Sequence, residues 1–117
     1  MSLTIYHNPR CSKSRQTLAL LQEAGAAPNI RLYLESPIDL DELNVLLKQL
    51  GFENPRQLMR RGESVYKALG LKDEADAEQL KKAMVENPKL IERPIVTDKN
   101  RAILGRPPEA VLELLQG

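Results

Sequence analysis

A strand, a helix and a second strand follow one another at the N-terminus, and this order constrains the fold more than any other feature. Residues 3–7 alternate apolar and polar side chains up to a turn at Asn8-Pro9, which predicts a strand. A helical stripe then runs from Ser12 to Gly25, through Leu18, Leu20, Leu21 and Ala24. A second alternating segment follows, with Ile30, Leu32 and Leu34. Because a helix between two strands lets them pair in parallel, we expect a βαβ unit.

The middle of the chain is predicted to be helical. Asp39 with Glu42 three residues later resembles a capping box, and an amphipathic helix follows that Gly51 closes, with Leu40, Leu43, Leu46, Leu47 and Leu50 on its apolar face. Shorter helices are predicted from Asn54-Pro55, over residues 65–69 before Gly70, and from Asp76 to a stop at Pro88.

The C-terminal part returns to a strand pattern. Residues 95–97, a turn over residues 98–100 and residues 101–104 predict a hairpin, and Pro107-Pro108 opens a last helix with Val111, Leu112, Leu114 and Leu115. The order β-α-β, helical block, β-β-α predicts an α/β fold with a mixed sheet and helices on its faces. Since 117 residues is an ordinary domain size, we expect a single domain over residues 1–117.

Composition excludes several classes of function. The chain has 17 basic and 16 acidic residues, so it carries no large net charge that would attract a nucleic acid or an anionic membrane. It has no Trp, three Tyr and one Phe, which leaves few aromatic rings on which bases could stack. Neither a nucleic acid nor an anionic membrane is therefore an expected partner. No apolar run approaches the roughly 18 residues of a membrane span, and the first residues do not resemble a signal peptide. We therefore expect a cytoplasmic protein.

The single cysteine, Cys11, is the main candidate for chemistry. It cannot form an internal disulfide or a structural zinc site, so stability must come from packing. Cys11 lies at the predicted helix start with Arg10, Lys13 and Arg15 nearby, and both the helix N–H groups and these cations favour a thiolate. A lone cysteine is otherwise a small buried hydrophobe. The loop, the helix start and the cations together favour the reactive thiolate.

Four tracts carry a resemblance to a known family: YHNPRCSKSR at residues 6–15, LMR at 58–60, ERPIV at 92–96 and GRPPE at 105–109. In this order, along nearly the whole chain, they resemble the glutaredoxin-linked arsenate reductase family. The resemblance implies a thioredoxin/glutaredoxin-like fold, a βαβ-ββα mixed sheet with a helical block inserted at about residues 39–88. Pro94 stands where that fold has a cis-proline beside the active cysteine.

The resemblance implies that Cys11 attacks arsenate and forms a thiol-arsenate adduct, and that Arg60, Arg93 and Arg106 hold the oxyanion. A tetrahedral oxyanion needs several converging donors, and arginine supplies a permanent charge with a fixed fork of N–H groups. Taken singly, each arginine is otherwise a solvated or salt-bridged surface residue. Only the family match separates Arg60 from its neighbour Arg61.

His7 and Ser14 match family positions that support the thiolate. His7 either tunes the thiol by charge or hydrogen bonding, or is a strand-end histidine bonded to backbone. Ser14 either donates its hydroxyl to the thiolate or caps the helix. Family members usually carry Gly-Thr after the cysteine, whereas this chain has Ser12-Lys13, which adds a cation.

With one cysteine, an outside thiol must complete the reaction. The resemblance implies glutathione as the reducing co-substrate and glutaredoxin as the partner that reduces the mixed disulfide, with arsenate or a similar oxyanion as substrate. We expect no bound cofactor and no metal, because His7 and Cys11 alone fall short of a ligand set.

Two other functions stay open. In the first, the chain is a thiol-disulfide or deglutathionylation redox protein that uses Cys11 and has no arsenate activity. In the second, the chain is a non-enzymatic regulator that binds a protein partner such as RNA polymerase. Regulators of this superfamily carry a Cys-x-x-Cys switch, and Ser14 occupies the place of the second cysteine, so an internal disulfide switch is excluded.

Overall fold

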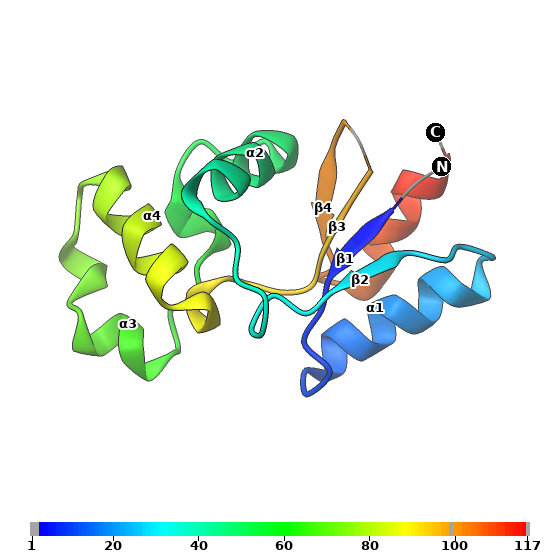
Figure 1. The fold of residues 1–117 in the computed structure, drawn as a ribbon, viewed down its shortest axis with the longest axis horizontal. Coiled ribbons are helices and arrows are strands. Elements are labelled where there is room, and N and C mark those ends of the chain that lie inside the picture. Colours follow the sequence, from blue (N-terminus) through cyan, green and yellow to red (C-terminus); the bar gives the residue numbers. More distant parts are fainter. Residues whose placement is uncertain (1–2, 99, 117) are drawn as a thin grey trace. The chain divides into compact units, whose positions relative to one another are not determined.

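The structure, a computed structural model, describes residues 3–98 and 100–116 and divides the chain into two units. The first unit combines the chain up to residue 36 with the chain from residue 93 onward, and the second comprises residues 37–92. The helical block predicted at about residues 39–88 falls inside the second unit. Figure 1 shows that the first unit holds the sheet and that the second is built from helices.

The first unit contains a four-stranded mixed sheet in the order β2-β1-β3-β4. Its elements in chain order are β1 (Thr4–Tyr6), α1 (Ser12–Glu23), β2 (Asn29–Arg31), β3 (Ile95–Thr97), β4 (Ala102–Leu104) and the 3₁₀ helix η4 (Pro108–Gln116). β1 is parallel to β2 and antiparallel to β3, and β3 is antiparallel to β4. The predicted α/β class, the parallel βαβ unit and the C-terminal hairpin are confirmed. The turn prediction at residues 98–100 includes Lys99, which lies outside the described residues.

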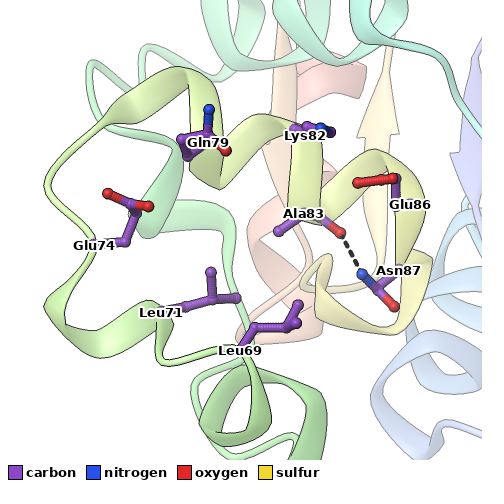
Figure 2. Close-up of a pocket in the computed structure, with 8 residues that line it drawn as sticks. All are labelled: Leu69, Leu71, Glu74, Gln79, Lys82, Ala83, Glu86 and Asn87. Atoms are coloured by element: carbon purple, nitrogen blue, oxygen red, sulfur yellow. Dashed lines mark hydrogen bonds between the residues drawn. The ribbon is translucent and has the colours of Figure 1, made fainter.

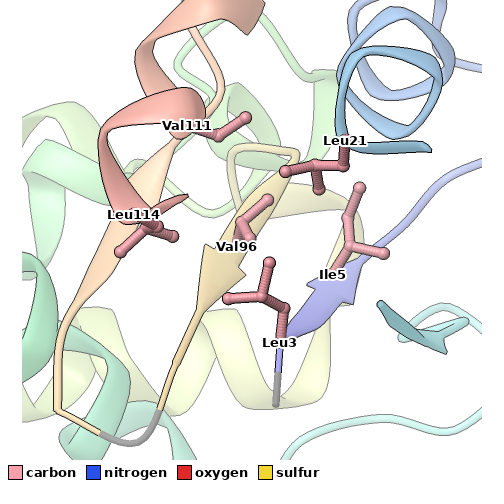
Figure 3. Packing of buried hydrophobic residues seen from close by; sticks show 6 residues of the cluster. All are labelled: Leu3, Ile5, Leu21, Val96, Val111 and Leu114. Atoms are coloured by element: carbon pink, nitrogen blue, oxygen red, sulfur yellow. The ribbon is translucent and has the colours of Figure 1, made fainter. Parts of the chain in front are cut away.

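One face of this sheet forms the core of the first unit. Figure 3 shows side chains from β1 and the residue before it, α1, β3 and η4 gathered in one cluster, made of Leu3, Ile5, Leu21, Val96, Val111 and Leu114. All six are almost fully buried. Burial of such side chains stabilises a fold by about 1.5–3 kcal/mol each relative to exposure. α1 and η4 therefore cover the same face of the sheet.

Two details of the predicted pattern are wrong. The buried residues of α1 are Ser14, Thr17 and Leu21, whereas the predicted Ala24 is exposed. Polar side chains are tolerated on this face because their hydroxyls find partners, as when Thr17 Oγ1 donates to the carbonyl of Lys13 at 2.8 Å.

The second difference concerns the strand predicted around Ile30, Leu32 and Leu34. β2 ends at Arg31, because the chain turns when the N–H groups of residues 35 and 36 both donate to the carbonyl of Leu32. In the turn, Tyr33 is the buried residue at 2% exposed, while Leu34 is 38% exposed; Ile30, within β2, is 50% exposed.

The second unit is helical, as predicted. Its elements are α2 (Leu40–Leu50), η1 (Pro55–Leu58), α3 (Ser64–Ala68), η2 (Leu71–Asp73), α4 (Ala77–Glu86) and η3 (Pro88–Leu90). Asp39 caps α2 by accepting the N–H of Glu42 at 2.8 Å, and Gly51 ends the helix in the left-handed region at φ 75°. The N-cap role of Asp39 is confirmed, and so is the apolar face of α2 at Leu43, Leu46 and Leu47. Leu40, which was predicted on the same face, is 41% exposed because it lies in the first turn of the helix.

Arg56 ties the short helices of the second unit together. Its Nη1 donates to the hydroxyl of Tyr66 at 2.7 Å and to the carbonyl of Leu71 at 2.8 Å, and its Nη2 donates to the carbonyl of Glu74. Figure 2 shows a neighbouring cavity bordered by α4 and by the segment around η2, where the Asn87 side chain donates to the carbonyl of Ala83 at 3.0 Å. The Arg56 side chain therefore links η1, on which it lies, to Tyr66 of α3 and to two carbonyls at and just after η2.

At Gly105 the hairpin, Thr17 of α1 and Pro94 come close together. Its N–H donates to the carbonyl of Pro94 at 2.8 Å. A methyl group added at Gly105 would lie 2.7 Å from Pro94 Cγ and 2.7 Å from Thr17 Oγ1, both well inside contact distance. Only glycine fits this position without moving its neighbours.

Gly105→Ala is expected to destabilise the chain by about 1–3 kcal/mol, the usual cost of overpacking a tight site. Urea unfolding followed by far-ultraviolet circular dichroism measures the change. Gly62→Ala is the matched control, because a methyl group there meets nothing within 4 Å. Equal stability of the two variants would contradict the close approach at Gly105.

Candidate active site

Cys11 occupies the N-cap position of α1, at the end of the loop that leaves β1. The loop is held by its own polar groups. The N–H of Cys11 donates to the carbonyl of Asn8 at 3.0 Å, and the N–H of Arg10 donates to the Asn8 side chain at 3.0 Å. Arg15 reaches back from α1 and donates to the carbonyl of Pro9 at 2.9 Å. The sulfur is therefore presented at a helix N-terminus by an ordered loop.

The pKa of Cys11 is lower than that of an ordinary thiol, although opposing effects act on it. Burial, the largest effect, raises this pKa, since the residue is only 8% exposed. The backbone N–H of Ser14, the side chain of Arg93 through a hydrogen bond and its charge, and the backbone N–H of Lys13 all lower it and together outweigh burial. The surroundings favour the thiolate, which is the nucleophilic form.

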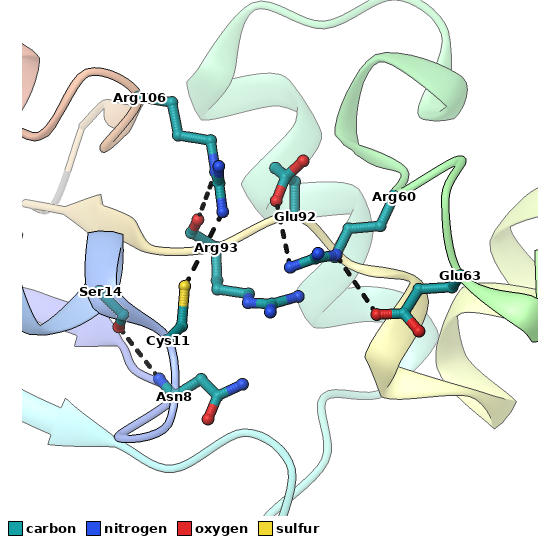
Figure 4. Close-up of polar contacts among 8 residues, drawn as sticks. All are labelled: Asn8, Cys11, Ser14, Arg60, Glu63, Glu92, Arg93 and Arg106. Carbon is teal, nitrogen blue, oxygen red and sulfur yellow. Dashed lines mark hydrogen bonds and ion pairs between the residues drawn. The ribbon is translucent and has the colours of Figure 1, made fainter.

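Arg93 and Arg106 meet at this sulfur. Figure 4 shows the Arg106 side chain pointing toward Cys11, and its Nη2 lies 3.8 Å from Cys11 Sγ. The Nε of the same guanidinium donates to the carbonyl of Arg93 at 2.8 Å. The Arg93 side chain also lies beside Cys11, where its hydrogen bonding and its charge both lower the pKa of the thiol. Two of the three predicted arginines thus border the thiolate, one of them oriented by the main chain of the other.

Ser14 and His7 form a polar pair behind the loop. His7 Nδ1 and Ser14 Oγ are 2.6 Å apart, and Ser14 Oγ also accepts the N–H of Asn8 at 3.1 Å. Both side chains are buried. The Ser14 hydroxyl therefore contacts His7 and the loop backbone, while its own N–H faces the sulfur. Burial and then the charge of Arg15 lower the pKa of His7, which keeps the imidazole neutral at neutral pH.

Arg60 belongs to the second unit. An isolated antiparallel bridge between Met59 and Ile91 fixes it there, because the N–H of Arg60 donates to the carbonyl of Leu90 at 2.7 Å. Its guanidinium makes ion pairs with Glu63 at 3.4 Å and with Glu92 at 3.7 Å (Figure 4). These carboxylates orient the Arg60 guanidinium. The sequence analysis did not predict either ion pair.

Two peptide bonds near the site are cis, those that precede Pro94 and Pro107. The first agrees with the expectation for Pro94, and the second was not predicted.

Within residues 3–98 and 100–116, no group of three histidine, cysteine or acidic side chains is arranged to hold a metal ion. Among the described helices, none has the length and apolar character that a membrane crossing requires.

One sequence family, ArsC, matches residues 6–114 of this chain. This chain belongs to the ArsC family. It is 51% identical over 117 residues to the arsenate reductase of Haemophilus influenzae, covering 98% of this chain and 100% of that protein. It is also 56% identical over 112 residues to a protein of Escherichia coli strain K12 named "Uncharacterized protein YfgD", covering 95% and 94% of the two chains.

Solved structures of the ArsC family have the same fold. The arsenate reductase from Vibrio cholerae superimposes with a TM-score of 0.94 at 53% identity, covering 97% of each chain. The resemblance seen in the sequence is confirmed, and the fold is the thioredoxin-like fold of this family, with its mixed sheet and added helices.

Arg93→Ala is expected to raise the pKa of Cys11, because it removes both a hydrogen bond and a positive charge that stabilise the thiolate. Alkylation by iodoacetamide, measured across pH, reports the thiolate fraction. The midpoint of the profile should move to higher pH, and alkylation near neutral pH should slow. Arg61→Ala, which removes an exposed arginine of the second unit, should leave the profile unchanged. An identical profile for Arg93→Ala would contradict the assignment.

Ser14→Ala is expected to destabilise the chain by about 1–3 kcal/mol, because it leaves the N–H of Asn8 without its buried acceptor. Denaturant unfolding of this variant beside Ser12→Ala, an exposed serine in the same helical turn, measures the difference. If both variants unfold at the same denaturant concentration, the hydroxyl has no structural role.

Proposed function

We propose that this ArsC-family chain is an oxidoreductase that reduces arsenate to arsenite through a covalent adduct on Cys11. The observation that carries the proposal is the contact of Arg106 Nη2 with Cys11 Sγ at 3.8 Å, beside an Arg93 side chain that lowers the pKa of the same thiol. The name of the Haemophilus influenzae relative and that of the Vibrio cholerae structure, both arsenate reductases, support the choice of substrate.

The geometry at Cys11 suits an anionic substrate. A thiolate and arsenate repel each other in water, so a reaction between them needs positive charge beside both. The guanidiniums of Arg93 and Arg106 supply this charge and a fork of N–H donors for the tetrahedral oxygens. They also stabilise the negative charge that develops as the sulfur attacks arsenic. Binding and the first chemical step therefore depend on the same two side chains.

The reaction balances with glutathione as the reductant. The Cys11 thiolate attacks arsenic, an oxygen leaves as hydroxide or water, and an S–As bond forms. A glutathione thiolate then attacks Cys11 Sγ, an S–S bond forms, and the electron pair of the S–As bond stays on arsenic, which becomes arsenite. Two thiols are oxidised to one disulfide while arsenic gains two electrons. Glutaredoxin then reduces the mixed disulfide and returns Cys11 to the thiolate.

Arg60 is proposed as the third oxyanion ligand. The motif match in the LMR tract supports this role, and the ion pairs with Glu63 and Glu92 give the guanidinium a defined orientation within its own unit. Glu92 directly precedes Arg93 in the chain. His7 and Ser14 are proposed to support the thiolate indirectly, because their pair holds the loop that presents Cys11.

Arsenate-dependent oxidation of NADPH in the presence of glutathione, glutaredoxin and glutathione reductase tests the proposal. The wild type should be active, Cys11→Ser should be inactive, and Arg93→Ala should lose activity by about tenfold or more, since a removed charge-assisted contact costs roughly 1.5–3 kcal/mol. If the wild type is inactive while Cys11 still titrates below an ordinary thiol, arsenate is the wrong substrate and the site is a thiol redox centre.

Neighbouring arginines supply a control within the same assay. Arg60→Ala should raise the KM for arsenate, whereas Arg61→Ala, exposed on the adjacent residue, should not. Equal effects of the two substitutions would remove Arg60 from the proposed oxyanion site while leaving Arg93 and Arg106 in it.

A further inference from the structure

A cavity of about 290 Å³ lies beside the Cys11 loop in the first unit. One wall is the loop itself, residues 7–10, and the other is the turn after β2, with Leu32, Leu34 and Glu35. Since β1 and β2 are parallel, both walls follow the carboxyl ends of neighbouring strands, where open α/β sheets commonly bind ligands. The N–H of His7 donates to the carbonyl of Arg31 at 2.9 Å and holds the walls together.

The lining combines an apolar surface with charges of both signs. Leu32 and Leu34 supply the apolar part, and Leu34 is 38% exposed although leucine is ordinarily buried. Arg10 on the loop and Glu35 on the turn are both exposed and carry opposite charges. Such a lining suits a small zwitterionic ligand better than a simple oxyanion, which Glu35 would repel.

We propose that this cavity binds the peptide part of glutathione, with Arg10 facing a carboxylate, Glu35 facing the ammonium group, and Leu32 and Leu34 against the backbone of the tripeptide. This inference rests on the proposed function, in which Cys11 needs an outside thiol. Glutathione carries both kinds of charge that the lining complements. It is also small enough for a cavity at the lower end of the size range of ligand pockets.

The cavity lies beside the residue that precedes Cys11 in the chain. Arg10, which lines the cavity, is bonded directly to Cys11, and adjacent Cα atoms are about 3.8 Å apart. An extended tripeptide spans up to about 10 Å. In this proposal the tripeptide is held by its ends in the cavity and extends its central cysteine past Arg10 toward Cys11 Sγ.

The position also fits the order of events in the reaction. Arg93 and Arg106 contact the sulfur from elements other than the two cavity walls, so the oxyanion and the thiol peptide have separate binding groups. A thiolate attacks a sulfur in line with the bond that breaks, hence from the side opposite arsenic. Both ligands must be bound at once for that attack, and separate groups for each allow it.

Thiol-disulfide exchange without arsenate tests the inference. Cys11 thiolate attacks one sulfur of glutathione disulfide, forms the Cys11-glutathione disulfide and releases one glutathione thiolate. Mass spectrometry follows the mixed disulfide over time. The same experiment with hydroxyethyl disulfide, which lacks charges and peptide bonds, reports the intrinsic reactivity of Cys11. The ratio of the two rates measures recognition of the peptide.

Three substitutions of exposed residues address the cavity: Glu35→Gln, Glu35→Lys and Leu34→Ser. We expect each to lower the rate with glutathione disulfide by about two- to fivefold, the effect of one partly exposed charge or apolar contact, and to leave the rate with hydroxyethyl disulfide unchanged. Arg10→Ala should lower the ratio of the two rates. Glu23→Gln, an exposed acidic residue of α1, is the matched control and should change neither rate.

Equal rate ratios for the wild type and all four cavity variants would overturn the inference. So would parallel losses with both disulfides, because those would show a change in Cys11 itself. Failure of the arsenate assay with intact selectivity for glutathione disulfide would overturn the proposed substrate while the peptide site stands. Arsenate activity with no selectivity would leave the proposed function in place and remove the site.

Discussion

The stabilisation of a mostly buried sulfur anion at the start of α1 is the constraint on which the rest of the site depends. Burial works against the thiolate, so every compensating group must be in place. The helix must begin at Ser12 for the N–H groups of Lys13 and Ser14 to face the sulfur. The second group that offsets the effect of burial is the Arg93 side chain, and strand register sets its position. Tyr6 pairs with Ile95, which brings the chain just before β3 alongside the loop after β1.

The hairpin completes the arrangement. Ile95 pairs with Leu104, so Gly105 and Arg106 follow beside Pro94 and Arg93. The close approach of Gly105 to Pro94 and to Thr17 of α1 locks this end of the sheet against the helix that carries Cys11. The site combines Cys11 with the region of Arg93 and Arg106, more than 80 residues later in the sequence. These segments can pack together because Gly105 has no side chain between them.

The sequence predicted the elements that follow local rules. Asp39, Gly51 and the leucine pattern between them specify α2 by capping and periodicity alone, and the alternation of residues 3–7 specifies β1. It failed where long-range contacts decide. Leu34 has strand pattern but lies in a turn, because Tyr33 occupies the buried position there. The Ser14 hydroxyl contacts His7 because the fold brings the two residues together. The sequence pattern at the start of the helix does not reveal this contact. Arg93 and Arg106 were identified by resemblance, but their mutual contact requires the hairpin register.

The hydrogen bond from Arg106 Nε to the carbonyl of Arg93 has a consequence for how the site can vary. Because one edge of the guanidinium is anchored to the main chain, its plane is already set, and in the proposed oxyanion site little side-chain freedom is lost on binding. A lysine would preserve the charge, but its single ammonium group cannot be anchored on the backbone and extend two fixed N–H groups to a ligand. The position therefore depends on preorganised shape as much as on charge, and an Arg-to-Lys exchange there would alter the entropy of binding more than its electrostatics.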